Sequence, residues 1–308
     1  MKHSLKITLI LLGMFLISQF IGLFVVSVYS PVTKQIDLGN GTLVNQTSHN
    51  LPLGLEPPQD TSPKTNIISI VIAFFFAIII MLILMNFKAE LILRFWFFIV
   101  IIIALILTLN AGLTGFTKYA LVLSTIIAIP LAYLKVFQRD IYLHNFTELL
   151  IYPGIAAIFV SMLNIWTTVL LLILISIYDI YAVWHAKFMQ KMAKYQINQV
   201  KVFSGFFVPY LLPKDKLALE KARKANIKNK KIKVSVAILG GGDVIFPIIL
   251  AGVVLNVFGF LSASIISIGA TLALSILFYY SEKGKFYPAM PFISAGCLIA
   301  LGIVYLIN

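Results

Sequence analysis

Long apolar runs, separated by short polar stretches, dominate this chain of 308 residues. A helix needs about 20 consecutive apolar residues to cross the hydrocarbon core of a bilayer, and most of these runs reach that length. The pattern therefore predicts an all-α fold, a polytopic membrane protein with nine transmembrane helices. The predicted spans are residues 7–29, 66–86, 91–109, 118–134, 148–165, 167–186, 234–257, 259–280 and 289–307.

The spans form one predicted membrane domain, residues 1–308, in which polar stretches mark three parts. Residues 1–186 hold the first six helices, residues 187–233 form a basic loop, and residues 234–308 hold the last three helices. The first span has a basic N-terminal flank like a signal peptide. It is too long for the apolar region of one and lacks a clear small-residue cleavage site, so we interpret it as a membrane anchor.

Composition agrees with this class of protein. Hydrophobic residues make up 60% of the chain and charged residues only 11%, whereas soluble domains carry about 25% charged residues. The single cysteine, Cys297, excludes an intramolecular disulfide framework and any paired-cysteine metal site. We expect no metal and no cofactor. The net charge of +13 raises the question of nucleic acid, but the positions of the charges argue for a membrane instead.

The basic residues are distributed unequally between alternate loops. With the N-terminus inside, 21 of the 24 Lys and Arg residues fall on the cytoplasmic side, and only Lys34, Lys64 and Lys118 fall outside. Thirteen of the 21 lie in the long loop 187–233, which counts for less, but the other eight still outnumber the outer three. The positive-inside rule thus predicts a multi-pass cell-membrane protein with a cytoplasmic N-terminus, a cytoplasmic 187–233 loop and an outer C-terminus.

Two polar stretches are long enough to be more than tight turns. Residues 30–65 are rich in Gly, Pro, Asn and Thr and are predicted to form an outer spacer. They contain two weak glycosylation patterns, Asn40-Gly-Thr42 and Asn45-Gln-Thr47. The cytoplasmic loop begins with a predicted amphipathic continuation of the sixth helix along the membrane surface. The rest of the loop is basic, with a short helix at most, and we expect it to be attracted to anionic headgroups.

Asp179 and Asp243 each stand alone inside a long apolar run. A carboxylate at mid-bilayer costs about 3 kcal/mol, so such residues usually face a cavity and carry function. Counting helical rise from Lys187 and Lys233 places the two acids about 12 and 15 Å from the cytoplasmic side. Matched depth predicts a single site. Because no basic residue in the spans is placed to neutralise them, we expect the two acids to share one proton, which provides one general acid and one general base.

The residues around the aspartates suit amide hydrolysis. Gly240, Gly241 and Gly242 precede Asp243, and we expect them to loosen the helix and let another backbone approach. Tyr178 precedes Asp179 and is a candidate for supporting the site. Two prolines disfavour helix and favour extended backbone at the start of the last span, which fits a wall that binds an unwound substrate. That segment is Pro288-Ala289-Met290-Pro291.

Together these three motifs resemble the presenilin and signal peptide peptidase family of intramembrane aspartyl proteases. The family has YD in one span, GxGD in the next and a PAL-type motif in the last; here they read Tyr178-Asp179, Gly240–Asp243 and Pro288–Pro291, with Met290 at the usual leucine. The resemblance covers the whole chain. It implies an aspartic endopeptidase with Asp179 and Asp243 as catalytic dyad, and a Pro288–Pro291 segment that shapes the active site and holds substrate.

The resemblance also implies partners. The expected substrates are transmembrane helices of other proteins within the lipid bilayer, with no nucleic acid, and the short loops suggest a minimal microbial, archaeal-type homologue. Signal peptide peptidases are inverted relative to presenilins, and the charge distribution here favours the presenilin-like orientation. We therefore expect a preference for substrate helices whose N-terminus lies outside.

Other functions remain open from the residues. An ion- or proton-coupled transporter or leak channel also places carboxylates at mid-membrane, although inverted repeats and paired broken helices are not evident. A prepilin-type peptidase would have fewer spans and no PAL-type motif. A non-catalytic scaffold accounts for neither the matched depth nor the cost of two buried acids.

Overall fold

The structure, a computed structural model, describes residues 5–37, 43–48, 51–55, 89–138, 140–184, 204–210, 235–281 and 287–308, with scattered positions between 68 and 87. Seven helices in these ranges are long and apolar enough to cross a membrane. The predicted segment 66–86 is described only at scattered positions, and those between 68 and 84 are helical. The seven helices are α1 (Leu5–Val28), α3 (Glu90–Leu113), α4 (Ala120–Phe137), α5 (Ile141–Met162), α6 (Ile165–Trp184), α9 (Gly241–Tyr280) and α10 (Met290–Ile307).

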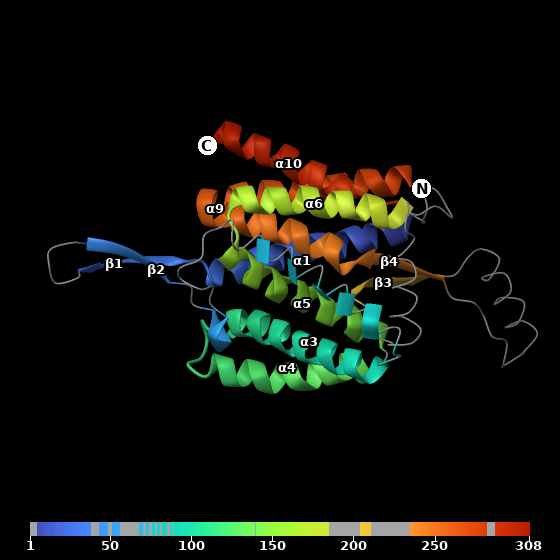
Figure 1. The fold of residues 1–308 in the computed structure, drawn as a ribbon, viewed down its shortest axis with the longest axis horizontal. Helices are drawn as coiled ribbons and strands as arrows, with labels where there is room; N and C mark the ends of the chain where they lie inside the picture. Colours follow the sequence, from blue (N-terminus) through green and yellow to red (C-terminus); the bar gives the residue numbers. More distant parts are fainter. Residues whose placement is uncertain are drawn as a thin grey trace, which may run out of the picture.

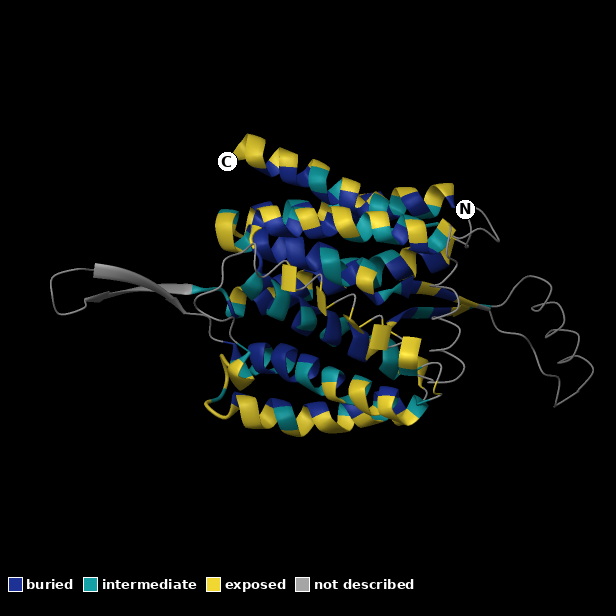
Figure 2. Cartoon of the chain, viewed as in Figure 1, coloured by how far each residue is buried: buried dark blue, intermediate teal, exposed yellow. Residues whose placement is uncertain are grey.

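The helices pack side by side in a stack (Figure 1). α4 lies against α3, α3 against α5, and α5 against both α1 and α9, while α10 lies against α9 and α6 at the far side. Buried residues gather in the middle of the stack and many exposed ones lie on its outer helices (Figure 2). The exposed side chains include large apolar ones such as Trp96, Ile126 and Leu306. Such an apolar exterior is suited to lipid contact, so the protein is a multi-pass membrane protein.

α9 is two helices joined by a reversal. As one straight helix its 40 residues would extend about 60 Å, twice the hydrocarbon core. Gly259 interrupts it with φ 82° and ψ −178°, a conformation that is essentially restricted to glycine. The first half begins with Asp243 near the start of α10. The second half begins beside the end of α10, where Asn308 Nδ2 donates to Ser262 Oγ at 3.2 Å. The two halves therefore run in opposite directions.

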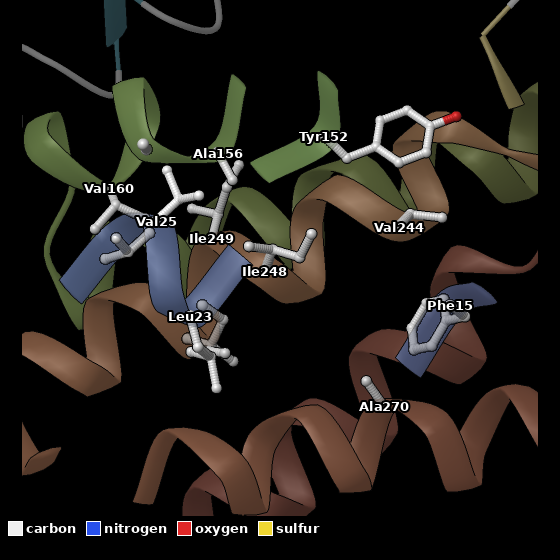
Figure 3. Packing of buried hydrophobic residues seen from close by; sticks show 14 of the residues in the cluster. Phe15, Leu23, Val25, Tyr152, Ala156, Val160, Val244, Ile248, Ile249 and Ala270 are labelled. Carbon is white, nitrogen blue, oxygen red and sulfur yellow. The ribbon is translucent and has the colours of Figure 1, made fainter. Parts of the chain in front are cut away.

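Close backbone contact holds α9 against its neighbours. Gly22 of α1 faces Ile248, and Gly252 faces Val26 and Val160, so that α1, α5 and the first half of α9 interlock (Figure 3). Gly269 of the second half faces Gly296 of α10 in the same way. Small residues at these crossings are the usual means by which membrane helices approach closely.

The all-α prediction is wrong in one respect, because the chain also forms two β-hairpins. β1 (Val32–Asp37) pairs with β2 (Leu43–Ser48) inside the region predicted as a plain spacer. β3 (Gly205–Tyr210) pairs antiparallel with β4 (Ser235–Gly240) at the opposite end of the bundle (Figure 1). Of the two glycosylation patterns, Asn45 lies on β2, whereas Asn40 falls outside the described residues.

The β3–β4 hairpin corrects two predictions next to the site. Residues 234–240 were expected to start the seventh span, but described residues 235–240 form β4 and the helix begins at Gly241. β4 alternates buried Ala237 and Leu239 with exposed Val236 and Ile238, the two-residue period of a strand. β3 falls within the loop expected to hold a short helix at most. The predicted amphipathic continuation after the sixth helix lies outside the described residues.

Candidate active site

Asp179 is held on α6 against the start of α10. Its side chain is only 5% exposed, and its Oδ2 accepts a hydrogen bond from the backbone N–H of Met290 at 3.1 Å. The N–H of Ala289 also reaches this carboxyl group. Tyr178, half-buried, interacts electrostatically with Asp179. Two backbone donors from the Pro288–Pro291 segment thus fix the position of the Asp179 carboxyl group.

Asp243 is located at the third residue of α9, directly after β4. Gly240 is the N-cap, and its backbone N–H reaches the Asp243 carboxyl group, whose Oδ2 lies beside Gly240. An acid that returns to the N–H of its own N-cap satisfies one of the unpaired donors of a helix start. Asp243 is half-buried, and its backbone is fixed by the strand–helix junction.

The structure brings the two aspartates close enough to interact electrostatically. Neither carboxylate forms an ion pair in the part of the chain that the structure describes. Without a neighbouring cation, two adjacent carboxyl groups are most stable when they hold one proton between them. No group of three or more His, Cys, Asp or Glu side chains among the described residues is arranged to hold a metal ion.

The PAL-type segment lies beside Asp179, but the extended backbone predicted for it is wrong at Met290 and Pro291, which are helical, and at Ala289, which has αR dihedral angles. Pro288 is buried and non-helical, and α10 begins at Met290, with Pro291 in its first turn, where a missing N–H costs nothing. One turn further from the aspartates, Ser176 Oγ of α6 lies 2.9 Å from Ser294 Oγ of α10. This contact ties the two helices together next to Asp179.

The three glycines before Asp243 do not loosen a helix, as predicted, but form the junction between β4 and α9. Gly240 ends the strand, and Gly242 is exposed. Gly241 is enclosed: a Cβ there would lie 2.9 Å from the Tyr152 ring and 2.5 Å from Ser204 Oγ. Its own N–H donates to the Ser204 carbonyl at 3.3 Å. The glycines therefore allow close packing at the junction, as the prediction of close backbone approach required.

A third buried acid, Glu148, was missed by the sequence reading. Its carboxylate accepts a hydrogen bond from Lys135 Nζ at 2.8 Å, with side-chain exposures of 1% and 3%. Lys135 had been predicted to lie in a cytoplasmic loop but belongs to the last turn of α4. His144 Nε2 lies 2.8 Å from the Gly205 carbonyl, and its Nδ1 lies 3.3 Å from Lys135 Nζ. The signal was present in the spacing of His144 and Glu148, which share a helix face.

Gln19 was missed as well. It is fully buried at the middle of α1, and its Nε2 donates to the carbonyl of Val244 at 3.0 Å. Val244 directly follows Asp243, so α1 contacts the backbone of the candidate site. The available signal was that Gln19 is the one amide side chain in the first predicted span.

Comparisons with known proteins identify the family and the fold. Residues 39–308 match the family described as signal-peptide peptidase, presenilin aspartyl protease. Two solved structures of a presenilin family intramembrane aspartate protease, in C222 and P2 space groups, are each 20% identical to the chain. They superpose with TM-scores of 0.60 and 0.59, covering 98% and 99% of this chain and 99% and 98% of theirs, which shows a shared fold. No curated protein sequence matches. The family match extends over most of the chain, which therefore belongs to the signal-peptide peptidase and presenilin family of aspartyl proteases.

Proposed function

We propose that Asp179 and Asp243 are the catalytic dyad of this intramembrane aspartyl protease and that they hydrolyse peptide bonds within transmembrane helices. The unprotonated carboxylate takes a proton from water, whose oxygen bonds to the amide carbon while the protonated acid gives its proton to the carbonyl oxygen. The C–N bond then breaks as the nitrogen takes a proton from one acid, while the other acid takes a hydroxyl proton from the tetrahedral carbon. This leaves a carboxylic acid and an amine and returns the dyad to one shared proton. The single observation that carries the proposal is that two acids on different helices lie within electrostatic range of each other, and that neither forms an ion pair with a described residue.

The free edge of β4 supplies a place for the substrate backbone. Asn145 of α5 bonds both backbone groups of Phe207, donating to its carbonyl at 2.7 Å and accepting from its N–H at 2.9 Å. Phe207 therefore turns its backbone away from β4. In an antiparallel ladder its partner Ile238 must then turn its own N–H and C=O away from β3, as do Val236 and Gly240 in the same register.

That free edge leads to Asp243. The N–H of Gly240 is on the outward-facing side of β4, and the Asp243 carboxyl group occupies it. Within the described residues, no backbone hydrogen bond is formed by the outward-facing N–H and C=O groups of Val236 and Ile238. A substrate segment that adds to this edge would form main-chain hydrogen bonds and place the following peptide bond at the dyad. Since helical peptide bonds are already internally bonded and shielded, such pairing requires local unwinding.

The finer topology is part of the proposal. Counting the two halves of α9 separately and adding the helical positions between 68 and 84 brings the seven helices to nine. We assign residues 1–186 to the six-helix part and 234–308, β4 included, to the last part. The basic 187–233 loop and the N-terminus are cytoplasmic and the C-terminus is outside, as the charge distribution favours. Pro288–Pro291 binds substrate opposite β4, with Tyr178 and the three glycines in support. No cofactor takes part.

The test uses purified protein in proteoliposomes with single-span substrates presented in both orientations. We expect cleavage within the span, with preference for substrates whose N-terminus lies outside, and loss of cleavage in Asp179→Asn and in Asp243→Asn separately. Retention of full cleavage by either variant would exclude the dyad. A transporter or leak channel remains the alternative; it would be supported if no peptide bond were cut but each substitution abolished ion flux.

A further inference from the structure

A row of buried polar side chains connects α4 with the start of α9. Glu148 accepts the hydrogen bond from Lys135 with Oε1, whereas its Oε2 has no hydrogen-bond partner within the described chain. One turn later on α5, Tyr152 is fully buried, and its hydroxyl also lacks a completed hydrogen bond there. The Tyr152 hydroxyl faces both Glu148 and Ser204. Two buried, unsatisfied polar atoms that face each other are costly unless they bond, so the phenol is directed toward Glu148.

Tyr152 also contacts the candidate site. A Cβ on Gly241 would lie 2.9 Å from Tyr152 Cε1 and 3.1 Å from its hydroxyl oxygen, so the phenol ring occupies the space of a side chain at position 241. Figure 3 shows Tyr152 projecting from α5 over α9 beside Val244. Asp243 lies two residues beyond Gly241 and interacts electrostatically with Tyr152.

We propose that Tyr152 is a positioning residue for Asp243, with its ring fixing Gly241 and its hydroxyl held by the Lys135–Glu148 pair. The inference rests on the proposed function of Asp243 as a member of the dyad. Gly241 is the first residue of α9, and a displacement there moves Asp243 through two peptide units. A misplacement of about 1 Å near a reacting group is enough to lower a catalytic rate by orders of magnitude. Tyr152 acts through the backbone and does not touch substrate.

A purely structural role for Tyr152 makes a different prediction. Its ring meets Phe206 of β3 edge to face, with centroids 5.3 Å apart, and this packing needs no hydroxyl group. Tyr152→Phe keeps the ring and removes only the hydroxyl, which faces Glu148 and Ser204. Tyr29→Phe is the matched control, because Tyr29 is also buried and its hydroxyl forms a hydrogen bond away from the candidate site. That hydroxyl donates to the carbonyl of Leu107 in α3 at 2.7 Å.

The experiment measures kcat, KM and thermal midpoint for purified Tyr152→Phe, Glu148→Gln, their double variant and Tyr29→Phe. We expect Tyr152→Phe to lower kcat about tenfold, the equivalent of one hydrogen bond, while KM changes less than about twofold. The double variant should be no slower than the slower single one, because both changes break the same link. Tyr29→Phe should lose thermal stability and keep its kcat.

A second readout does not depend on cleavage. The infrared carbonyl band that Asp243→Asn removes should shift in Tyr152→Phe and stay in place in Tyr29→Phe. If wild type cleaves, the aspartate variants do not, and Tyr152→Phe keeps both kcat and band, the positioning role is wrong and the dyad stands. An equal kcat loss in Tyr29→Phe would also overturn it. If an aspartate variant still cleaves, the dyad fails, and the infrared band alone decides whether Tyr152 acts on Asp243.

Discussion

Breaking the Lys135–Glu148 pair should destabilise the protein strongly. With Lys135→Met, the side chain of Glu148 keeps an exposure of about 1% and loses the donor at 2.8 Å, so its charge is left without a partner in an apolar environment. Removing one partner of a buried ion pair costs about 3–5 kcal/mol. The remaining neighbour, His144 Nε2 at 3.5 Å from Oε1, is already directed at the Gly205 carbonyl and compensates little. A drop in thermal midpoint on the order of 10 °C in detergent is expected.

The double variant Lys135→Met with Glu148→Gln separates charge from packing. It removes both charges, so it should recover most of the stability that the single substitution loses, because neutral replacements of a buried pair are often tolerated. Thermal unfolding of the three proteins in one detergent, followed by tryptophan fluorescence, measures the difference. The reasoning is wrong if Lys135→Met is as stable as the wild type. It is also wrong if the double variant is no more stable than Lys135→Met, because the loss would then not come from an unpaired charge on Glu148.

Two further predictions concern the backbone around the site. Asn145→Ala removes both bonds to Phe207. Amide hydrogen exchange across residues 205–210 and 235–240 should then increase by about 5- to 150-fold, as expected when about 1–3 kcal/mol of pairing is lost, and cleavage should be slower. Unchanged exchange would contradict the role of Asn145. Gly259→Val places a β-branched residue at φ 82°, which should cost about 1–3 kcal/mol and lower the thermal midpoint, whereas Gly302→Val, with open space around it, should not.

Most of the helices could be predicted because a bilayer leaves few alternatives. An apolar run of about 20 residues must be helical to satisfy its own backbone, so composition alone located α1, α3 and α10 within a few residues. β4 could not be predicted, because its residues after Ser235 are apolar or glycine and merge with the apolar run of α9 in the sequence. Short apolar runs do not distinguish strand from helix by periodicity. The three glycines marked the junction, but they were read as part of a helix.

The supporting residues were harder to predict than the aspartates. An acid inside an apolar run is conspicuous, whereas Lys135 and Glu148 stand at the edges of such runs, where solvated charges are ordinary. Their burial depends on α4 and α5 packing side by side, a tertiary contact that spacing along one helix cannot reveal. Tyr152 likewise matters only because α9 begins against it.

The open edge of β4 and the half-buried Asp243 lie at the same place, the junction where β4 ends and α9 begins. In an apolar environment, an unpaired backbone edge persists only where it lines a water-filled cavity or binds another chain. β3 is closed on its far side by Asn145, so among the described strands of this hairpin the free edge belongs to β4, which leads to Asp243. Amide hydrolysis in a bilayer requires water and an extended peptide at the same place. A free strand edge can be hydrated by water before substrate arrives and can pair with the extended substrate backbone afterwards, so it meets both requirements.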